Sequence, residues 1–432
     1  MREMKDSGIE WIGQIPKGWE LRRAKTLFTQ RNSKGNEIEV LLSPTQKYGV
    51  VPQSQLEGVV QVKEDTDLQM FKTVHKGDFV ISLRSFQGGF EYSLYEGVCS
   101  PAYQVFYPTS PICDTYYRYL FKSQSFISKM NNLTVGIREG KNIQYVDFAN
   151  SQIPVPPLAE QEHIAAFLDA ECAEIDAVLE KTRASIEEYK KLKQAVITQA
   201  VTKGIRGDRP MKDSGIEWIG DIPAEWRKTQ LRHCAAIKSG ITLGKKYEKT
   251  DSLVERPYLR VANVQDGYVD LSVLTTIEVT QDEDLKYRLR SGDVLMTEGG
   301  DRDKLGRGCV WHGEIEPCLH QNHIFAVQTS KDTLLPEFLE YLTVSDVGRS
   351  YFDVTAIKTT NLACTSSSKV LAFTIPLPSV EEQAEIVEAL NTKCAGIDAL
   401  VAKKQQYLTE IENYKKSLIY EYVTGKKEVH PL

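Results

Sequence analysis

The sequence predicts a mixed α/β (α+β) protein with two globular domains separated by a pair of long antiparallel helices, arranged as a pseudo-two-fold internal repeat. Three observations predict this fold class: a short segment occurs twice, a long helical segment occurs twice, and two dissimilar segments of mixed character lie between them. At 432 residues the chain is too long for one hydrophobic core. We therefore expect domains at residues 1–152 and 211–374, and helical spacer regions at 153–210 and 375–432.

A tandem repeat organises the chain. Residues 4–19 and 211–226 are identical at 13 of 16 positions, at an offset of 207 residues. Residues 153–202 and 375–424 align without gaps at an offset of 222 residues, and 18 of 50 positions match. We call these repeated segments the frame. The order of the segments indicates that two similar copies of the frame hold two different regions.

The frame encloses a first insert (20–152) and a second insert (227–374), which show no obvious identity to each other. A Gly-Asp turn followed by a short apolar strand occurs in both inserts, at 76–82 and 291–296. Helices are expected late in each insert, which indicates a shared fold despite the lack of identity. The helices are predicted at 114–130 and 335–345, and further strands at 98–107, 257–264, 308–312 and 322–328.

The longer frame segments predict helices near 158–204 and 380–425. Apolar residues recur at steps of three and four, the helical period. Ser379 and Glu382 have the spacing of a capping box, and Gly204 and Gly425 are suitable helix ends. An apolar seam of this length needs a partner helix. The duplication favours antiparallel pairing within the chain, and a coiled coil between two chains is the alternative.

Composition and motifs exclude several classes of protein. Hydrophobic residues make up 41% and charged residues 26%, the mean hydropathy is -0.34, and no apolar run approaches the ~18 residues of a membrane helix. The start of the sequence carries no apolar signal segment, and none of the eight cysteines has Cys-x-x-Cys spacing, so we expect reduced thiols in a cytoplasmic protein. The sequence holds no phosphate-binding loop, nucleophile elbow or base-methylation motif, so we expect no catalysis by this chain.

One group of residues leaves a metal site open. Five possible zinc ligands lie within fifteen residues: Cys309, His312, Cys318, His320 and His323. Their spacing fits no familiar zinc finger, and strand alternation places several where Cys and His commonly pack. We expect structural roles and no bound metal, with a zinc-dependent nuclease as an alternative.

Nucleic-acid binding has broader support. The net charge is -6, but the first insert carries 15 Lys and Arg against 13 Asp and Glu, while the second carries 19 against 20. Loops in both inserts combine basic, amide and aromatic residues, which bind base edges and phosphates in other proteins. The candidate DNA-binding residues are Lys47, Tyr48, Arg84, Phe86, Gln87, Arg138, Lys141, Asn142, Lys245, Lys246, Arg302, Lys304, Arg307, Gln321 and Asn322.

The motifs of the frame resemble one known family. The matching segments are Lys212-Asp213-Ser214-Gly215-Ile216-Glu217-Trp218-Ile219-Gly220, the helix start from Ile153-Pro154 to Glu160-Gln161, and the helix end Gln199-Ala200-Val201-Thr202-Lys203-Gly204. With their order along the chain, they are similar to the specificity subunit of type I restriction–modification systems. Lys76-Gly77-Asp78 and Gln321-Asn322-His323 look like parts of that family's target-recognition domains.

The resemblance implies a division of labour. Each insert is then a target-recognition domain for one half of a split sequence in double-stranded DNA, and the helices set the spacer. Partner subunits would supply methylation with S-adenosylmethionine and cleavage with ATP and Mg. Because the frame is duplicated, we expect two modification subunits to bind it, with exposed Trp11, Trp19, Trp218 and Trp226 as candidate contacts. A coiled-coil scaffold whose inserts bind protein is the other alternative.

Overall fold

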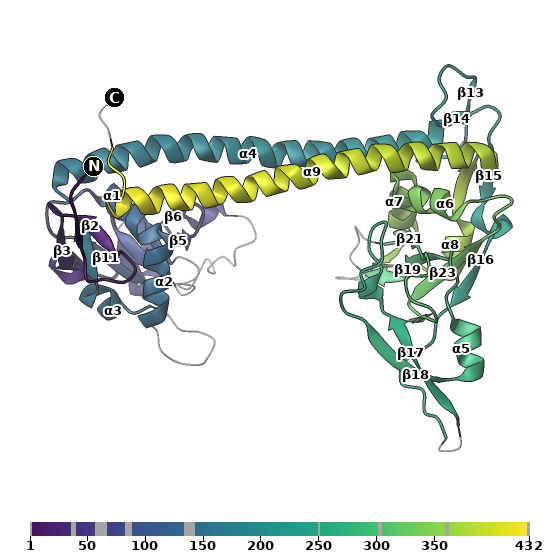
Figure 1. The fold of residues 1–432 in the computed structure, drawn as a ribbon, viewed down its shortest axis with the longest axis horizontal. Coiled ribbons are helices and arrows are strands. Elements are labelled where there is room, and N and C mark those ends of the chain that lie inside the picture. Colours follow the sequence, from purple (N-terminus) through teal and green to yellow (C-terminus); the bar gives the residue numbers. More distant parts are fainter. Residues whose placement is uncertain are drawn as a thin grey trace. The chain divides into compact units, whose positions relative to one another are not determined.

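The computed structural model describes residues 2–35, 40–56, 67–82, 89–133, 143–248, 251–300, 305–358 and 363–429. The chain divides into two compact units. The first comprises Met1–Arg183 and Gln406–Leu432, and the second comprises Ala184–Gln405. Each unit contains one insert, one copy of the short frame segment and part of each long helix (Figure 1). This division falls within the two long helices, whereas the segments predicted from the sequence keep each helix whole.

The first unit is built on a four-stranded sheet in the order β4-β11-β8-β9. Its strands are β4 (Phe28–Arg31), β8 (Phe79–Ile81), β9 (Phe90–Tyr92) and β11 (Gln104–Pro108). Antiparallel pairs surround the sheet: β1 (Met4–Asp6) with β2 (Gln14–Pro16), β3 (Glu20–Arg23) with β12 (Gln152–Val155), β5 (Leu42–Thr45) with β6 (Gly49–Pro52), and β7 (Lys72–Val74) with β10 (Gly97–Cys99). Helices α1 (Asp114–Lys122), α2 (Gln124–Leu133) and α3 (Tyr145–Asn150) follow the sheet in the chain.

The second unit has a four-stranded sheet in the order β16-β23-β19-β21. Its strands are β16 (Ala235–Ser239), β19 (Val294–Thr297), β21 (Gly308–Val310) and β23 (Ile324–Thr329). Its other strands are β13 (Met211–Asp213), β14 (Asp221–Pro223), β15 (Arg227–Gln230), β17 (Leu253–Leu259), β18 (Thr275–Thr280), β20 (Gly299–Gly300), β22 (Leu319–His320), β24 (Ile357–Lys358), β25 (Ala363–Cys364) and β26 (Thr374–Leu377). Its shorter helices are α5 (Gln281–Tyr287), α6 (Pro336–Val344), α7 (Asp346–Thr355) and α8 (Ser367–Ala372).

The two inserts share a topology, which confirms the expectation of a common fold. In both four-stranded sheets, the last strand in the chain lies between the first and the second, and the third lies at the edge. The frame strands also correspond, because β1 pairs with β2 as β13 pairs with β14, and β3 pairs with β12 as β15 pairs with β26. The similarity of fold therefore persists where sequence identity does not.

The Gly-Asp turn is identical in both sheets. Gly77 and Gly292 have φ angles of 92° and 95°, which favour glycine. The carboxylates of the following residues, Asp78 and Asp293, each accept a bond from the backbone amide three residues earlier, at 2.8 and 2.9 Å. Both carboxylates are buried. Asp78 also pairs with Arg31 on β4 at 2.8 Å, so the turn fixes the second strand of the sheet to the first.

The two long helices are α4 (Leu158–Lys203) and α9 (Val380–Val423), within two residues of the predicted ends. They lie side by side and run antiparallel (Figure 1). In the first unit Lys415 pairs with Asp176 at 2.6 Å, and in the second Lys193 pairs with Asp398 at 2.7 Å. The offset of 222 relates the two pairs, so the frame makes the same ion pair twice. The chain therefore pairs its own helices in each unit, and the intermolecular alternative is not needed.

For the inserts, the predicted type of element, helix or strand, was correct more often than its predicted length. Residues 98–107 contain two strands, β10 and β11, with a turn between them, and 114–130 contains two helices that break at Ser123. The Ser123 hydroxyl donates to the Leu120 carbonyl at 2.7 Å, which closes the first helix. Strand β17 ends at Leu259, earlier than predicted, and a 3-10 turn follows it. Along the described ranges, none of the helices combines the length and apolar content needed to span a bilayer.

Candidate nucleic-acid interface

The short frame segment of the first unit is held to the start of α4 by a cluster of three side chains. Trp19 is fully buried, and its Nε1 donates to Glu160 at 2.9 Å. Arg2 donates to the same carboxylate at 2.8 Å and lies over the Trp19 ring, 5.4 Å from the centroid. We call Arg2, Glu160 and Trp19 the first Arg–Glu–Trp cluster.

The second unit repeats this cluster at the start of α9. Trp226 Nε1 donates to Glu382 at 2.9 Å, Arg209 donates to Glu382 at 2.6 Å, and Arg209 lies 5.1 Å from the Trp226 ring centroid. The predicted cap is present, because the Glu382 amide donates to the Ser379 hydroxyl at 3.3 Å. The carboxylate expected to complete the capping box binds Arg209 and Trp226 instead.

These clusters correct the expected partner contacts. Trp19 and Trp226 were predicted to be exposed, and both are buried because each indole lies between its frame strands and the start of a long helix. Trp11 and Trp218 are half-buried. They pack against Phe126 and Tyr351, with ring centroids 5.7 and 6.2 Å apart.

In the first unit, the described candidates for DNA contact are Lys47 and Tyr48, at the turn between β5 and β6. Tyr48 is 59% exposed, and Lys47 Nζ lies 4.8 Å from the centroid of its ring. A hydrogen bond to Tyr48 raises the pKa of Lys47, so its charge is retained at neutral pH. The turn thus presents an aromatic ring and a cation together, which suits contact with a base and a phosphate.

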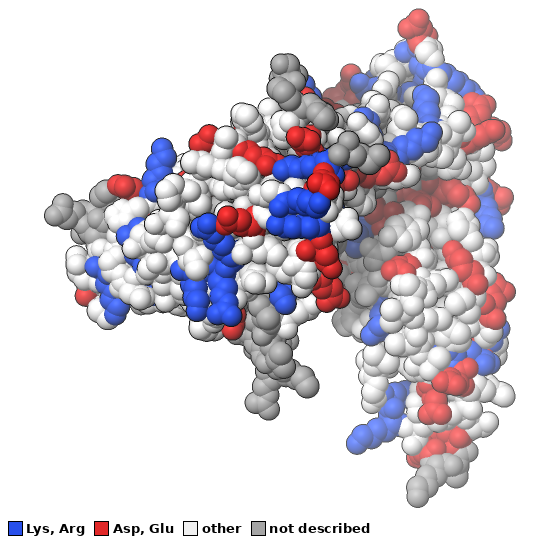
Figure 2. All heavy atoms as spheres, turned by 60° about the vertical axis from the view of Figure 1, so that its left-hand side comes forward, with Lys and Arg blue, Asp and Glu red and all other residues white. Residues whose placement is uncertain are grey.

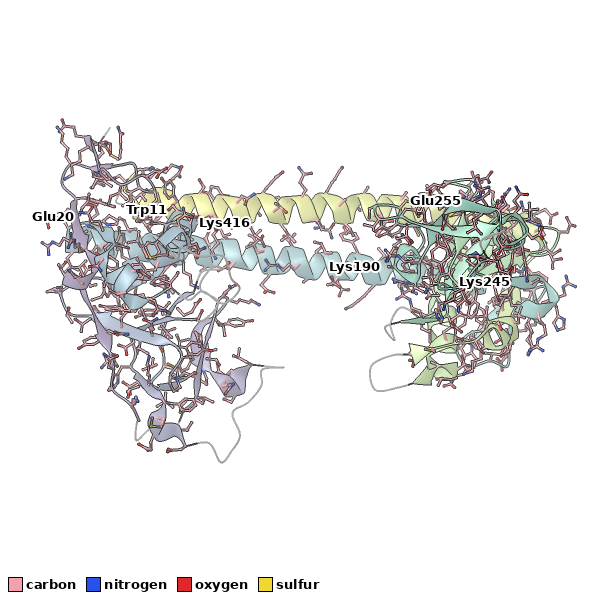
Figure 3. The ribbon with its side chains drawn as sticks, turned by 90° about the horizontal axis from the view of Figure 1, so that it is seen from below. Trp11, Glu20, Lys190, Lys245, Glu255 and Lys416 are labelled. Carbon is pink, nitrogen blue, oxygen red and sulfur yellow. The ribbon has the colours of Figure 1, made fainter. Side chains whose placement is uncertain are left out.

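In the second unit, Lys245 and Lys246 are exposed on the loop that follows β16, which we call the lysine loop. Lys245 is labelled in Figure 3. Lys245 pairs with Glu283, in the first turn of α5, and Tyr247 donates to the same carboxylate at 2.9 Å. Lys245 therefore has a carboxylate partner that would compete with a phosphate.

The amide candidates lie close to the start of that loop. Gln321 forms a parallel bridge with Ile241, and the Asn322 amide donates to the Ile241 carbonyl at 3.1 Å. Both side chains are half-buried, as is Arg307, whose Nε finds no partner among the described residues. The structure thus brings Gln321 and Asn322 to the base of the lysine loop. Eight further candidates lie outside the described residues: Arg84, Phe86, Gln87, Arg138, Lys141, Asn142, Arg302 and Lys304.

Charged side chains of both signs are scattered over the face drawn in Figure 2. Lys and Arg side chains there lie among Asp and Glu side chains. Any DNA contact on this face would therefore depend on particular loops more than on a broad basic surface.

The possible zinc ligands are dispersed. Cys309 and Cys318 lie in an apolar cluster, and burial raises the pKa of both thiols to about 12. His320 is fully buried, and burial lowers its pKa to about 4. His312 and His323 are exposed, and His323 Nδ1 lies 2.5 Å from Glu298. Among the described residues, no group of three or more His, Cys, Asp or Glu side chains is placed to hold a metal ion, so the zinc alternative has no ligand set there.

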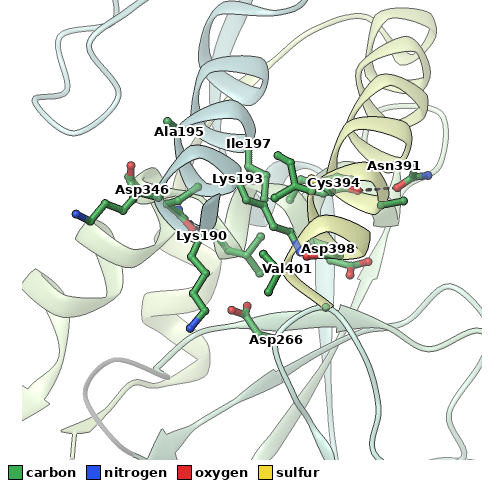
Figure 4. Close-up of a pocket in the computed structure, with 18 of the residues that line it drawn as sticks. Lys190, Lys193, Ala195, Ile197, Asp266, Asp346, Asn391, Cys394, Asp398 and Val401 are labelled. Carbon is green, nitrogen blue, oxygen red and sulfur yellow. Dashed lines mark hydrogen bonds and ion pairs between the residues drawn. The ribbon is translucent and has the colours of Figure 1, made fainter. Parts of the chain in front are cut away.

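A groove of about 1070 Å³ in the second unit lies between α4, α6 and α9 (Figure 4). Its cations have partners: Lys193 pairs with Asp398 at 2.7 Å, and Arg349 pairs with Asp266 at 3.3 Å. Burial raises the pKa of Glu340, which also lines the groove, to about 7. Because its basic groups are bound to carboxylates, the groove does not suit a phosphate backbone.

The comparisons with known proteins give one consistent result. Residues 16–188 match the sequence profile of the Type I restriction modification DNA specificity domain. The chain is 26% identical over 329 residues to the EcoKI specificity subunit of Escherichia coli K12, which covers 74% of this chain and 67% of that protein. It is 28% identical over 306 residues to the MjaVIII specificity subunit of Methanocaldococcus jannaschii, which covers 68% and 67%.

Solved structures support the same fold. A chain from a study of complex assembly and conformational transition in a type I R-M system aligns with a TM-score of 0.70 and 17% identity, over 96% of this chain and 99% of that one. The HsdS subunit of Thermoanaerobacter tengcongensis aligns with a TM-score of 0.50 and 16% identity, over 98% and 100%. These comparisons confirm the resemblance inferred from the sequence: the chain is similar to type I restriction–modification specificity subunits, and residues 16–188 match the DNA specificity domain of that family.

Proposed function

We propose that this chain is the DNA-recognition subunit of a type I restriction–modification enzyme in the cytoplasm. Each insert recognises one half of a bipartite sequence in double-stranded DNA, and the paired helices α4 and α9 set the spacer. The chain itself is non-catalytic and binds no cofactor. Partner subunits bind S-adenosylmethionine for methylation, and ATP and Mg for cleavage.

The observation that carries this proposal is a duplicated fold with divergent loops. The two sheets have the same strand order, and the two Arg–Glu–Trp clusters make the same contacts. The loops differ, since Lys47 and Tyr48 form a tight turn in the first unit, and the lysine loop of the second unit is tied to α5. One scaffold with two different binding surfaces is what recognition of two unrelated half-sites requires.

Exchange of an insert tests this proposal. A chain that carries the first insert of a relative in place of residues 20–152 is expressed with its modification partners, and methylated positions are mapped on genomic DNA. We expect the first half-site to change and the second to stay the same, and the reciprocal exchange of residues 227–374 is the matched control. A hybrid chain in which neither half-site changes, or in which both change, would contradict independent recognition. Methylation that no longer depends on either insert would instead favour the protein-binding scaffold.

Two modification subunits would need two equivalent surfaces, and exposed apolar residues on the long helices support this part of the proposal. Val178 on α4 and Leu400 on α9 are 39% and 44% exposed and are related by the offset of 222. Leu192 and Tyr414, 49% and 54% exposed, form a second related pair. Val178 and Tyr414 belong to the first unit, and Leu192 and Leu400 to the second. Each unit therefore has one member of each related pair, one on each helix, and exposed apolar residues favour protein contact.

These surfaces replace the buried tryptophans as the proposed partner contacts. We expect the wild-type chain to bind two modification subunits, measured as the mass of the reconstituted complex by light scattering. Leu192→Glu and Tyr414→Glu should each reduce this to one, because each places a charge in one of the two contacts. Lys190→Glu is the control, since Lys190 already lies exposed on the same helix. A one-to-one wild-type complex at saturation, or full binding by both variants, would contradict the assignment.

A further inference from the structure

The turn between β5 and β6 is fastened to the body of the first unit. Gly49 packs so closely against β9 that an added Cβ would lie 2.7 Å from the Tyr92 carbonyl oxygen. Val50 forms a parallel bridge with Ser93, and the Tyr48 amide donates to the Thr45 hydroxyl at 3.0 Å. These contacts hold the strands and one side of the turn, which carries Lys47 and Tyr48.

Lys122 holds the other side of the turn. It is the last residue of α1, and its Nζ donates to the Gln46 carbonyl at 3.5 Å. The same ammonium group donates to Glu91 on β9 at 2.6 Å. Lys122 therefore connects the main chain beside Lys47 and Tyr48 to the central sheet.

Glu91 is a buried acid that has a hydrogen-bond partner on only one of its two oxygens among the described residues. Its side chain is 1% exposed, and its Oε2 has no hydrogen-bond partner among the described residues. Burial raises the pKa of Glu91 to about 7, although the Lys122 charge opposes this shift. Lys122 is the charged group that acts on Glu91. The nearby Tyr92 hydroxyl and Asp114 carboxylate bind each other at 2.5 Å.

We propose that Lys122 is a positioning residue for DNA recognition: held by Glu91, it fixes the turn at Gln46 so that Lys47 and Tyr48 meet the first half-site in one orientation. This inference rests on the proposed function and adds the residues that orient one recognition loop. The position equivalent to Lys122 at the offset of 222 is Val344, so the second unit lacks this anchor. The effect is therefore confined to the first half-site.

The anchor depends on pH. The ionised Glu91 carboxylate holds the Lys122 ammonium group, and protonation of Glu91 removes that attraction. Because the pKa of Glu91 is raised to about 7, the anchor is complete above this pH and is lost as the pH falls through it. Discrimination at the first half-site should fall over the same interval, while discrimination at the second stays constant.

Competition binding with the full chain and its modification partners tests the inference. The probes are a labelled duplex that contains the target defined by methylation mapping, and competitors with one substitution in either half-site. Lys122→Met and Glu91→Gln should lower discrimination at the first half-site about tenfold at pH 8, within the range of one mismatched base pair. Between pH 8 and pH 6 the wild type should lose a similar factor, and both variants should show a flat profile.

Three further variants make the result unambiguous. Lys25→Met is the matched control, since Lys25 is an exposed lysine of the same unit and should leave both half-sites unchanged. Lys122→Arg keeps the charge and should restore discrimination, including where Lys122→Met lowers the unfolding temperature. Tyr48→Ala should reduce discrimination at the first half-site.

Two results would overturn the inference while the proposed function stands. One is wild-type discrimination and pH dependence in both Lys122→Met and Glu91→Gln. The other is a Tyr48→Ala chain with intact discrimination, because Lys122 would then act through another group. A wild-type complex that distinguishes neither half-site from random duplex would instead refute the proposed function itself.

Discussion

The two Arg–Glu–Trp clusters allow one prediction to be worked out from burial alone. Glu160→Ala and Glu382→Ala each remove an ion pair to arginine and a hydrogen bond from a tryptophan Nε1. Both glutamates lie in the first turn of a long helix, so their interaction with the helix dipole is the same and cancels in the comparison. Two differences remain: the exposure of the cluster to water, and the exposed Glu225, which also pairs with Arg209 at 3.0 Å.

The side chains of the second cluster are less exposed to water than those of the first. The side chains of Arg209 and Glu382 are 10% and 5% exposed, whereas those of Arg2 and Glu160 are 23% and 25% exposed. Glu382→Ala leaves the buried Arg209 with the exposed Glu225, which compensates its charge poorly, and loss of a buried partner costs about 3–5 kcal/mol. Where water reaches the remaining arginine, the cost is about 1–2 kcal/mol. We therefore expect Glu382→Ala to destabilise the second unit about 2 kcal/mol more than Glu160→Ala destabilises the first.

Hydrogen exchange of backbone amides measures this separately for each unit. The amides of β14 and β15 report on the second cluster, and those of β2 and β3 on the first. Glu385→Ala is the control, because Glu385 and its partner Arg206 are 48% and 53% exposed and the loss should stay below about 1 kcal/mol. An equal or larger cost for Glu160→Ala, or a cost above 2 kcal/mol for Glu385→Ala, would refute the argument from burial.

Two further predictions concern the helices and the buried acid. Four residues inserted just before Gly204 add about 6 Å of helix, so the preferred spacer should lengthen by one or two base pairs of ~3.4 Å. Selection of bound DNA from a library of variable spacers measures this length. An unchanged spacer in an active variant would show that another element sets the spacer. The folded protein holds the proton of Glu91 more tightly than the unfolded chain, so its ionisation lowers stability as the pH rises from about 4.5 to about 7. Glu91→Gln should therefore gain stability relative to wild type across that interval, by up to about 3 kcal/mol in thermal unfolding, and a difference independent of pH would contradict the shifted pKa.

The frame could be predicted from the sequence because its structure is set by local patterns and by repetition. The apolar seam and terminal glycines place the ends of α4 and α9 to within two residues. Repetition also carries pairing information, since a duplicated helix that pairs antiparallel can make the same contact twice, as Asp176 with Lys415 and Lys193 with Asp398 do. The repeated Glu160 and Glu382 were a signal of the same kind, but no local pattern shows which tryptophan a glutamate will meet.

Exposure was the property that the sequence could not supply. Trp11 and Trp19 occupy the same sixteen-residue segment, yet the first is half-buried and the second fully buried. The difference arises from contacts 141 residues away, between Trp19 and Glu160. The same holds for Lys245, whose partner Glu283 lies 38 residues further along the chain. Tertiary pairing therefore decides which candidate side chains remain available for a ligand.

The bonds between frame and insert explain how one frame can hold dissimilar inserts. Gln161 and Gln383 are buried, and their side-chain oxygens accept the backbone amides of Cys113 and Leu335, at 2.9 and 2.8 Å. A backbone amide is present at any residue except proline, so this bond places no demand on the side chain of the insert.

One reverse contact in the first unit follows the same rule, whereas Arg118 and Tyr119 of the insert bind the Asp169 carboxylate on α4 through their side chains. The hydroxyl of Tyr116, in the first insert, donates to the backbone carbonyl of Val423 at 2.7 Å. The bonds of Gln161, Gln383 and Tyr116 each use the main chain of one partner, which is independent of the residue type there. Substitutions in the recognition loops, such as those at Lys47 or Tyr48, therefore leave these attachments intact. A frame that binds its inserts in this way can keep its own residues fixed while the surfaces that contact DNA change.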